Sequence, residues 1–263
     1  MGGPAPAVRI LADLHNHSCL SPCASLEESP SLIARLSAER GLSLVALTDH
    51  NSALNCPAFG QACRREGIAP VYGIEASSVE EVHVLCLFAT AAEALSFGET
   101  LRGLLQIVPY DPEKLGDEVV VDADDLVLDL PDYYLGAALS LGFDELCAEA
   151  SLRGAIVIPA HVDRPMFSVS SQLGFLPPGP YDAVESMREP PRELCLGLCA
   201  ISGSDSHYPE HVCRRPFAVD LPGDLLAASA AAGASATAEA ELFAALRAAL
   251  RESRVEPYWT AKA

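Results

Sequence analysis

The chain has 263 residues, half of them hydrophobic, and a formal net charge of −19 from 36 acidic and 17 basic side chains. This length fits one or two domains, a single α/β barrel included. No apolar run in the sequence reaches the roughly 18 residues that a transmembrane helix needs. The first ten residues, MGGPAPAVRI, lack the basic start and apolar centre of a signal peptide. We therefore expect a cytoplasmic protein with no membrane contact, and a surface this acidic disfavours long nucleic acids as partners.

Nine cysteines are scattered through the chain, an odd number that does not indicate a disulfide framework. Cys19 and Cys23, and again Cys195 and Cys199, have CxxxC spacing, whereas zinc knuckles and thioredoxin-like sites have CxxC. We therefore expect most cysteines to be small buried hydrophobic residues and not redox pairs.

Short apolar runs alternate with helical patterns along the chain. Strands are expected at 8–14, 42–48, 69–74, 83–88, 155–160, 183–185 and 198–202. Helices are expected at 30–40, 53–65, 91–106, 134–153 and 238–251, the last from an apolar repeat at helical spacing. This alternation predicts a parallel sheet or barrel with helices outside, in a single domain spanning 1–263.

Two segments interrupt this rhythm. Residues 107–133 are acidic with little helical period, and we interpret them as an insertion, either a small hairpin or a lid. Residues 222–237 are rich in Ala, Ser and Gly, which predicts a flexible connection before the last helix.

Polar residues gather where the expected strands end or begin. This set consists of Asp13, His15, His17, Asp49, His50, Glu75, His83, His161, Arg164, Asp205 and His207. His15 and His17 lie two residues apart, as do Asp205 and His207, so each pair shares one face of an extended chain. At the ends of neighbouring strands the two pairs would converge at the mouth of a barrel, where α/β folds build their sites.

Each of these residues also has an ordinary structural explanation. A single histidine at a strand end is more often a hydrogen-bonded residue than a ligand, Asp49 could cap the next helix, and Glu75 could be a solvated carboxylate. His211 is left unassigned because nothing pairs it with the others. Six of the seven histidines, however, fall at strand boundaries with acidic neighbours, and packing does not explain that joint placement.

Imidazole and carboxylate ligands together suit zinc, manganese or iron. A carboxylate such as Glu75 can bridge two ions, and two ions about 3.5–4 Å apart hold the attacking and leaving oxygens of a phosphoryl transfer. A zinc-type ion also lowers the pKa of its bound water to about 7. Asp13 and Asp49 are expected to orient the ligand imidazoles without contacting a metal themselves.

The motifs DLHNH, LTDHN, GIE, VH, PAH and SDSH, in this order over residues 8–220, resemble the polymerase and histidinol phosphatase (PHP) superfamily. The resemblance implies a distorted (β/α)7 barrel that binds two or three divalent metal ions and hydrolyses phosphoesters. The resemblance implies three metal sites. The first consists of His15, His17, Glu75 and Asp205, and the second of Glu75, His83 and His161. The third consists of His50 and His207 with one residue from the loop after the first motif.

That loop departs from the family pattern. Family members commonly have Asp or His there, often in an SDG-like turn, whereas this sequence has SPC. Cys23 is the expected substitute because a thiolate is a competent, zinc-favouring ligand. Cys19 is the weaker candidate, and a simple buried thiol remains the alternative for both, so the occupancy of the third site stays open.

The preferred hypothesis is a metal-dependent phosphomonoesterase for a small phosphorylated substrate, in which a metal-bound hydroxide attacks phosphorus in line. Arg164 would bind the phosphate through its planar fork, unless it only forms a surface salt bridge. Asp205 or a histidine such as His207 would assist proton transfer. Three divalent ions would make the pocket net positive within an acidic protein, which attracts a small phosphate.

Two other functions compete with this hypothesis. One is a phosphodiesterase or exonuclease acting on nucleotides or short oligonucleotides, and the other is a non-catalytic metal-binding regulatory module. The sequence indicates neither the organic part of the substrate nor the oligomeric state.

Overall fold

The computed structural model describes residues 6–259. Residues 1–5 and 260–263 lie outside the described residues. Residues 1–5 are half of the N-terminal stretch from which the cytoplasmic location was predicted, and residues 260–263 belong to the predicted domain. Within 6–259, no helix is both long and apolar enough to cross a membrane.

The centre of the molecule is a curled seven-stranded sheet. Its strand order is β11 (Val255–Pro257), β10 (Phe217–Pro222), β1 (Ala7–Asp13), β2 (Leu42–Leu47), β3 (Ala69–Ser77), β4 (His83–Phe88) and β7 (Ile156–Pro159). A parallel pair, β8 (Val184–Glu185) and β9 (Ala200–Ile201), lies beside β7, where Asp182 N donates to Val157 O. The curled α/β arrangement confirms the predicted distorted barrel class.

The sheet is parallel only in part. β1, β2 and β3 are parallel, but β10 is antiparallel to β1, and β4 is antiparallel to both β3 and β7. Only residues 78–82 connect β3 to β4, and a parallel crossover needs a dozen or more residues. The antiparallel turn brings the first residue of β4, His83, to the same edge as the last residues of β3.

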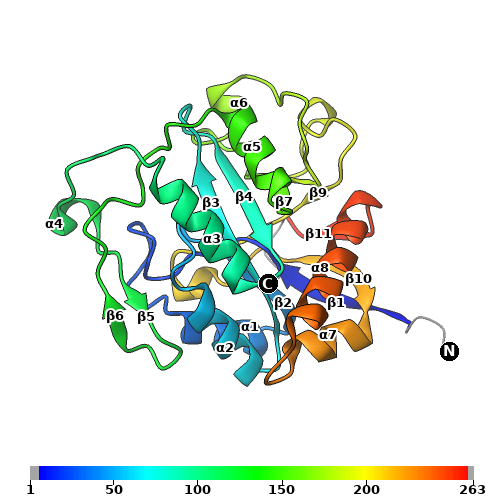
Figure 1. Ribbon diagram of the computed structural model, residues 1–263. Helices are drawn as coiled ribbons and strands as arrows, with labels where there is room; N and C mark the ends of the chain where they lie inside the picture. Colours follow the sequence, from blue (N-terminus) through cyan, green and yellow to red (C-terminus); the bar gives the residue numbers. More distant parts are fainter. Residues whose placement is uncertain (1–5, 260–263) are drawn as a thin grey trace.

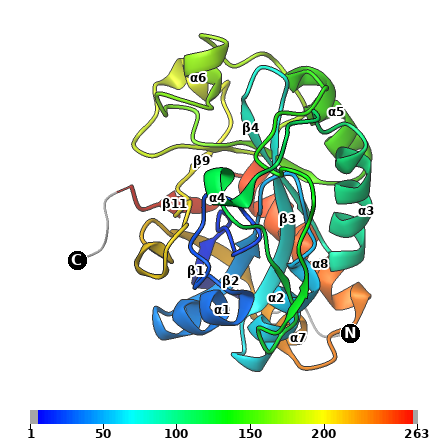
Figure 2. The same cartoon turned by 90° about the vertical axis from the view of Figure 1, so that its left-hand side faces the viewer.

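Helices cover both faces of the sheet. On one face lie α1 (Pro30–Glu39), α2 (Cys56–Arg65), α3 (Ala91–Arg102) and α5 (Phe143–Leu152), and on the other α8 (Ala236–Arg251). The alternation along β4 fits this layering, because Val84 and Cys86 pack with α3 and α5 whereas Leu85 and Leu87 pack with α8. In Figure 2, β3 and β4 run side by side with α3 and α5 along one side.

Local signals explain where several helices begin and end. The Ser29 hydroxyl accepts from Leu32 N and Pro30 occupies the first turn, so α1 begins there. Gly41, just after α1, has a φ of 80°. Helices commonly end with a glycine in this left-handed conformation. Thr90 and Glu93 form a capping box at the start of α3.

The predicted insertion is a short helix, α4 (Pro112–Leu115), followed by a two-stranded hairpin of β5 (Val120–Val121) and β6 (Val127–Asp129). Residues 107–133 thus contain a hairpin. The hairpin lies beside α2, with α4 farther out (Figure 1). Arg65 of α2 donates to Ala123 O at 2.8 Å and to Asp124 Oδ1 at 2.7 Å, which ties the hairpin to the body.

Two predicted segments differ from the structure. The helix predicted at 134–153 begins only at Phe143, because Asn51 Nδ2 donates to Leu135 O and Ala137 O and holds a turn, in which Ala137 N donates to Tyr134 O. The predicted flexible connection at 222–237 contains α7 (Gly223–Ala230), whose Leu226 is buried against α8 and β10. Strands β10 and β11 were also missed by the sequence analysis.

The remaining elements are short and lie in the loops that surround the sheet edge: α6 (Val169–Gln172), η1 (Arg192–Leu194) and η2 (Pro209–His211).

Candidate metal centre

The polar side chains singled out in the sequence come together at one edge of the sheet. His15 and His17 follow β1, and His50 follows β2. Glu75 lies near the end of β3, and His83 begins the antiparallel β4. The rest of the set follows β7 and β9: His161, Asp205 and His207.

Glu75 is the centre of this cluster. Its Oε1 lies 2.8 Å from His83 Nδ1, 3.1 Å from His161 Nε2 and 3.2 Å from His15 Nε2. Its Oε2 lies 3.1 Å from His50 Nδ1 and 3.2 Å from His17 Nε2. Burial raises the pKa of this carboxyl, but the surrounding histidines outweigh burial and hold the pKa well below its usual range. Glu75 is therefore a buried carboxylate that presents both oxygens to imidazoles.

Asp205 closes the cluster from the other side. Its Oδ1 lies 3.5 Å from His15 Nε2 and 3.4 Å from His17 Nε2. Its Oδ2 accepts from Arg164 Nη1 at 3.1 Å. Burial raises the pKa of Asp205 and the nearby histidines outweigh burial, so the pKa is well below the ordinary value.

Hydrogen bonds on the far side of two rings assign their tautomers. His15 Nδ1 lies 2.9 Å from Glu185 Oε2, and a carboxylate can only accept, so Nδ1 carries the proton. The Ser21 hydroxyl donates to Asp49 Oδ1 at 2.7 Å and so accepts from His17 Nδ1 at 3.0 Å. In the neutral rings Nε2 is then the atom with the free lone pair, and it is turned into the cluster. Burial lowers the pKa of both rings, but the neighbouring carboxylates outweigh burial and raise it, for His17 to about 9, so a metal ion would have to displace the Nε2 protons.

This donor set fits divalent metal ions. The Nε2 atoms of His15 and His17 lie only 3.1 Å apart, so both could ligate a single cation. Five imidazoles surround Glu75, more than the roughly four lone-pair positions of a carboxylate. Asp205 Oδ1 and His50 Nδ1 are buried without a hydrogen-bond partner. Three groups have ligand atoms within 4.8 Å of one another: His15, His17 and Asp205; His50, Glu75 and His83; and His17, His50 and His207.

Cys23 lies at the exposed side of the cluster. Its Sγ is 3.1 Å from His207 Nε2, while His207 Nδ1 donates to Asp205 O at 3.0 Å. Burial of the thiol, followed by the charges of Glu75 and Asp205, raises the pKa of Cys23 to about 12. The thiol is therefore protonated at neutral pH unless a cation takes the place of the proton.

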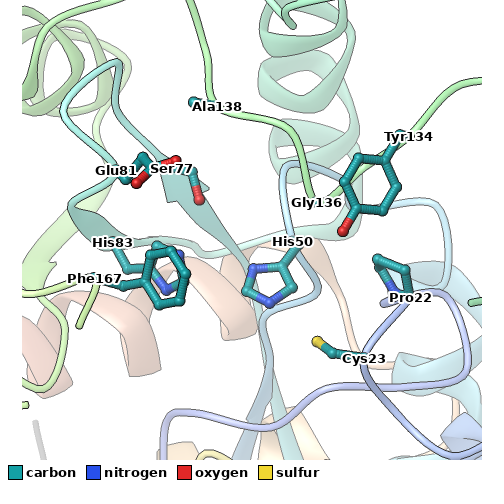
Figure 3. Close-up of a pocket in the computed structure, with 10 residues that line it drawn as sticks. All are labelled: Pro22, Cys23, His50, Ser77, Glu81, His83, Tyr134, Gly136, Ala138 and Phe167. Atoms are coloured by element: carbon teal, nitrogen blue, oxygen red, sulfur yellow. The ribbon is translucent and has the colours of Figure 1, made fainter. Parts of the chain in front are cut away.

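A cavity of 170 Å³ opens beside the cluster (Figure 3). The Phe167 ring stacks on His83 with centroids 4.8 Å apart, and Tyr134 lies on the opposite side with its hydroxyl turned toward Cys23 and Pro22. Tyr134 can lie there because its ring covers Gly136, where a Cβ would come within 2.5 Å of it. The cavity lining consists of Pro22, Cys23, His50, Ser77, Glu81, His83, Tyr134, Gly136, Ala138 and Phe167.

Comparison with known proteins identifies the family. The family model of the PHP domain matches residues 13–151. The chain belongs to the PHP domain family. Membership confirms the family expected from the six motifs. No curated protein matches the chain.

Solved structures share the fold of this PHP domain at low sequence identity. The lesion-specific endonuclease Q of Pyrococcus furiosus matches 93% of the chain with a TM-score of 0.61 and 16% identity. The chain spans 56% of that protein. A second match is a two-domain Bacteroides vulgatus protein containing a predicted PHP-like metal-dependent phosphoesterase, with a TM-score of 0.55 and 16% identity. The match covers 99% of this chain and 68% of that protein. A Bifidobacterium adolescentis protein proposed to be a metal-dependent phosphoesterase has a TM-score of 0.52 and 20% identity over 74% of this chain and 87% of its own.

The structure brings together the residues that the sequence analysis predicted as metal ligands, and their role as ligands stays a prediction. The first and third groups contain the predicted histidines, with His17 contributing to both. In the second group, His50 takes the place predicted for His161, although His161 Nε2 still contacts Glu75. His211, which the sequence analysis left unassigned, contacts the Tyr208 ring.

The two predicted orienting acids have different environments. Asp49 acts on His17 through Ser21 and also accepts from Ser18 N and Ser18 Oγ. Asp13 Oδ1 contacts backbone, accepting from His15 N and Ser204 N, and touches no imidazole. Burial raises the pKa of Asp13 to about 6.

Two residues of the PHP centre were missed by the sequence analysis. Glu185 bonds His15 and also accepts from His161 N at 2.9 Å, and Ser21 connects Asp49 to His17. A signal for Glu185 is present, because it follows the apolar run AV as Glu75 follows GI. Ser21 has no comparable signal, because serine is common in any loop.

Proposed function

We propose that this PHP domain is a phosphomonoesterase for small phosphorylated substrates that works with two or three divalent ions, zinc, manganese or iron. The observation that carries the proposal is Glu75, a buried carboxylate with five imidazole nitrogens within 3.2 Å, next to a cavity of 170 Å³. The proposal also takes the chain as one PHP domain, and the cytoplasmic location stays a prediction.

The residues that would hold the ions are those predicted from the motifs: His15, His17, Cys23, His50, Glu75, His83, His161, Asp205 and His207. Bound divalent ions would supply an activated water and neutralise charge on the phosphoryl group. The protein's own contribution is to keep the imidazoles in the ligating tautomer, through Glu185 for His15 and Ser21 for His17.

Arg164 is the proposed phosphate-binding side chain. Its Nη1 contacts Asp205 Oδ2 at 3.1 Å, which fixes the guanidinium beside the cluster, and the side chain is 33% exposed and so within reach of a substrate. The planar fork of arginine matches phosphate oxygens. Asp205 and His207, at the edge between the buried ligands and the solvent, are the proposed proton carriers.

The size of the site and the charge of the protein favour a small phosphorylated substrate over a nucleic acid. A cavity of 170 Å³ accepts a small organic group, and none of its ten lining residues is Lys or Arg. Nucleic-acid binding depends on basic side chains that neutralise phosphates, whereas this protein has a net charge of −19. The phosphodiesterase or exonuclease alternative draws support from the fold shared with endonuclease Q.

The test is metal analysis of the purified protein combined with a substrate panel. We expect two or three ions per chain and hydrolysis of p-nitrophenyl phosphate in preference to bis(p-nitrophenyl) phosphate and a short single-stranded oligonucleotide. Removing the ions with a chelator should abolish turnover, and adding them back should restore it. Preference for the diester or the oligonucleotide would establish the alternative, and bound metal with no hydrolysis would establish a regulatory metal-binding module.

The variant Glu75→Gln tests the role of the central carboxylate. We expect loss of turnover by about 100-fold or more together with loss of bound metal, since the bridging charge is gone. Glu81→Gln, at the rim of the same cavity, is the matched control and should retain its metal. Full activity of Glu75→Gln with unchanged metal content would contradict the proposed mechanism.

A further inference from the structure

The turn that carries Asp205 and His207 has an unusual backbone. It runs from Gly203 to His207 between β9 and η2, outside the seven-stranded sheet. Asp205 has a φ of 48°, in the left-handed region that non-glycine residues seldom occupy. Because this conformation aims the Asp205 carboxylate at the cluster, something in the fold must stabilise it.

Two consecutive arginines hold this turn through its backbone. Arg214 donates from Nε to Ser204 O at 2.6 Å and from Nη2 to Asp205 O at 3.2 Å. Arg215 donates from Nε to Gly203 O at 3.0 Å and from Nη2 to Ser204 O at 3.4 Å. Arg215 N also donates to the Ser204 hydroxyl at 3.1 Å. The carbonyls of residues 203, 204 and 205 thus all accept from guanidinium groups.

We propose that Arg214, supported by Arg215, is a positioning residue for the metal centre. The carbonyl of Asp205 accepts from both Arg214 and the Nδ1–H of His207. Arg214 therefore acts on the carboxylate of Asp205 and on the tautomer of His207 through a single peptide group. The planar guanidinium can span two adjacent carbonyls, which the single nitrogen of a lysine cannot do in the same geometry.

The same turn also supports the opposite side of the centre. Gly203 lies so close to Glu185 that an added Cβ would come within 1.7 Å of Glu185 Oε1. A displaced turn would therefore move Glu185, which fixes the tautomer of His15. Holding residues 203–205 in place consequently orders ligands on both sides of Glu75.

The experiment compares Arg214→Lys and Arg215→Lys with Arg254→Lys. Arg254 is a matched control, because its Nη1 also donates to a backbone carbonyl, that of Asp220, at a distance of 2.7 Å. Asp220 lies in β10, away from the turn at 203–207. The full-length protein is purified with its ions, and three quantities are measured: the chelator concentration that removes half of the metal, kcat and KM for p-nitrophenyl phosphate, and the melting temperature of the metal-free protein.

We expect Arg214→Lys to weaken metal retention and lower kcat by about 10- to 100-fold, the effect of losing a residue that orients metal ligands. KM should change less than kcat, and Arg215→Lys should show a smaller loss of the same kind. The metal-free melting temperature of Arg214→Lys should match that of Arg254→Lys, whose metal retention stays at the wild-type value. In Arg214→Ala, added guanidinium ion should restore part of the metal retention.

Wild-type metal retention and kcat in Arg214→Lys would overturn the inference. The inference would also be overturned by equal losses of metal in Arg214→Lys and Arg254→Lys, or by no rescue of Arg214→Ala by guanidinium. Either result would mean that Arg214 contributes only to general stability. The inference rests on the proposed metal-dependent function, but the two fail differently. A wild-type protein that binds no metal contradicts the proposed function, whereas a metal-loaded, active wild type with an unaffected Arg214→Lys contradicts only the role of Arg214.

Discussion

Glu185 and His15 are 170 residues apart in the chain, yet Glu185 Oε2 accepts from His15 Nδ1 at 2.9 Å in the buried interior. The Glu185 carboxylate also accepts from His161 N, so one side chain orders two of the histidine motifs. Burial raises the pKa of Glu185, but the neighbouring His15 outweighs burial and lowers the pKa below the ordinary value. Glu185 is therefore a charged acceptor that leaves Nε2 of His15 as the ligating atom.

Glu185→Gln should weaken this orientation. The neutral amide accepts a weaker hydrogen bond and can present its NH₂ group to Nδ1, which would favour the wrong tautomer of His15. We expect metal affinity and kcat to fall about 10- to 100-fold. Metal content and kinetics check this, with Glu193→Gln on the exposed η1 as the control. Unchanged metal affinity in Glu185→Gln would show that Glu185 does not orient the ligand.

Gly203→Ala should disturb the same contact from the other side. The added Cβ would lie 1.7 Å from Glu185 Oε1 and 3.0 Å from His15 Cβ, so the buried carboxylate must move. We expect a stability loss of about 1–3 kcal/mol from overpacking, together with weaker metal binding. Chemical denaturation and metal titration measure the two effects.

The control for this substitution is Gly223→Ala, whose Cβ would meet Val8 at an ordinary 3.5 Å. A double variant, Gly203→Ala with Glu185→Ala, removes the clashing carboxylate and should lose less stability than the sum of the single changes. Strict additivity would mean that the clash with Glu185 is not the cause.

The sequence was sufficient to single out the proposed ligands because their signals are local. His15 and His17 follow an apolar run at a spacing of two, and the ends of neighbouring strands meet at one edge of the sheet whatever the loops between them do. The residues that orient these ligands carry no such signal. Glu185 and Ser21 acquire their roles only through contacts that the fold creates, the first over 170 residues.

The errors in the fold have a similar origin. Residues 222–237 have a composition typical of a flexible connection, but α7 forms there because Leu226 is buried against α8 and β10. The helix predicted from residue 134 is prevented by the side chain of Asn51, which bonds the carbonyls of Leu135 and Ala137. Tertiary contacts decided both cases, burial of a leucine in the first and side-chain hydrogen bonds in the second.

Cys23→Ser should reveal whether the thiol is a metal ligand. Cys23 Sγ lies 3.1 Å from His207 Nε2, and a thiolate favours zinc more strongly than a serine hydroxyl does. We expect the variant to lose about one zinc ion per chain while the ions near Glu75 remain. Metal content measured after dialysis checks this, and Cys195→Ser, at the residue that follows η1, is the control. Identical zinc content in Cys23→Ser and the wild type would remove Cys23 from the ligand set.

Glu118 gives the insertion a pH-dependent stability. Its side chain is buried, Oε1 accepts from Leu135 N at 2.7 Å, and Oε2 has no hydrogen-bond partner. Burial raises the pKa of this carboxyl from its ordinary 4.5 to about 8. Between pH 4.5 and 8 the folded state keeps a proton that the unfolded state has released, so the contribution of Glu118 to stability falls as the pH rises.

Glu118→Gln should remove that loss, because a neutral amide oxygen can still accept from Leu135 N. We expect the free energy of unfolding of the variant to exceed that of the wild type. This margin should grow from pH 5 to pH 8 and stay constant above pH 8. The final margin should reach a few kcal/mol, at about 1.4 kcal/mol for each unit of pKa displacement. Denaturant unfolding at a series of pH values measures this margin, with Glu113→Gln on the exposed α4 as the control. A margin that does not change with pH would mean that Glu118 has the same pKa in the folded and unfolded states.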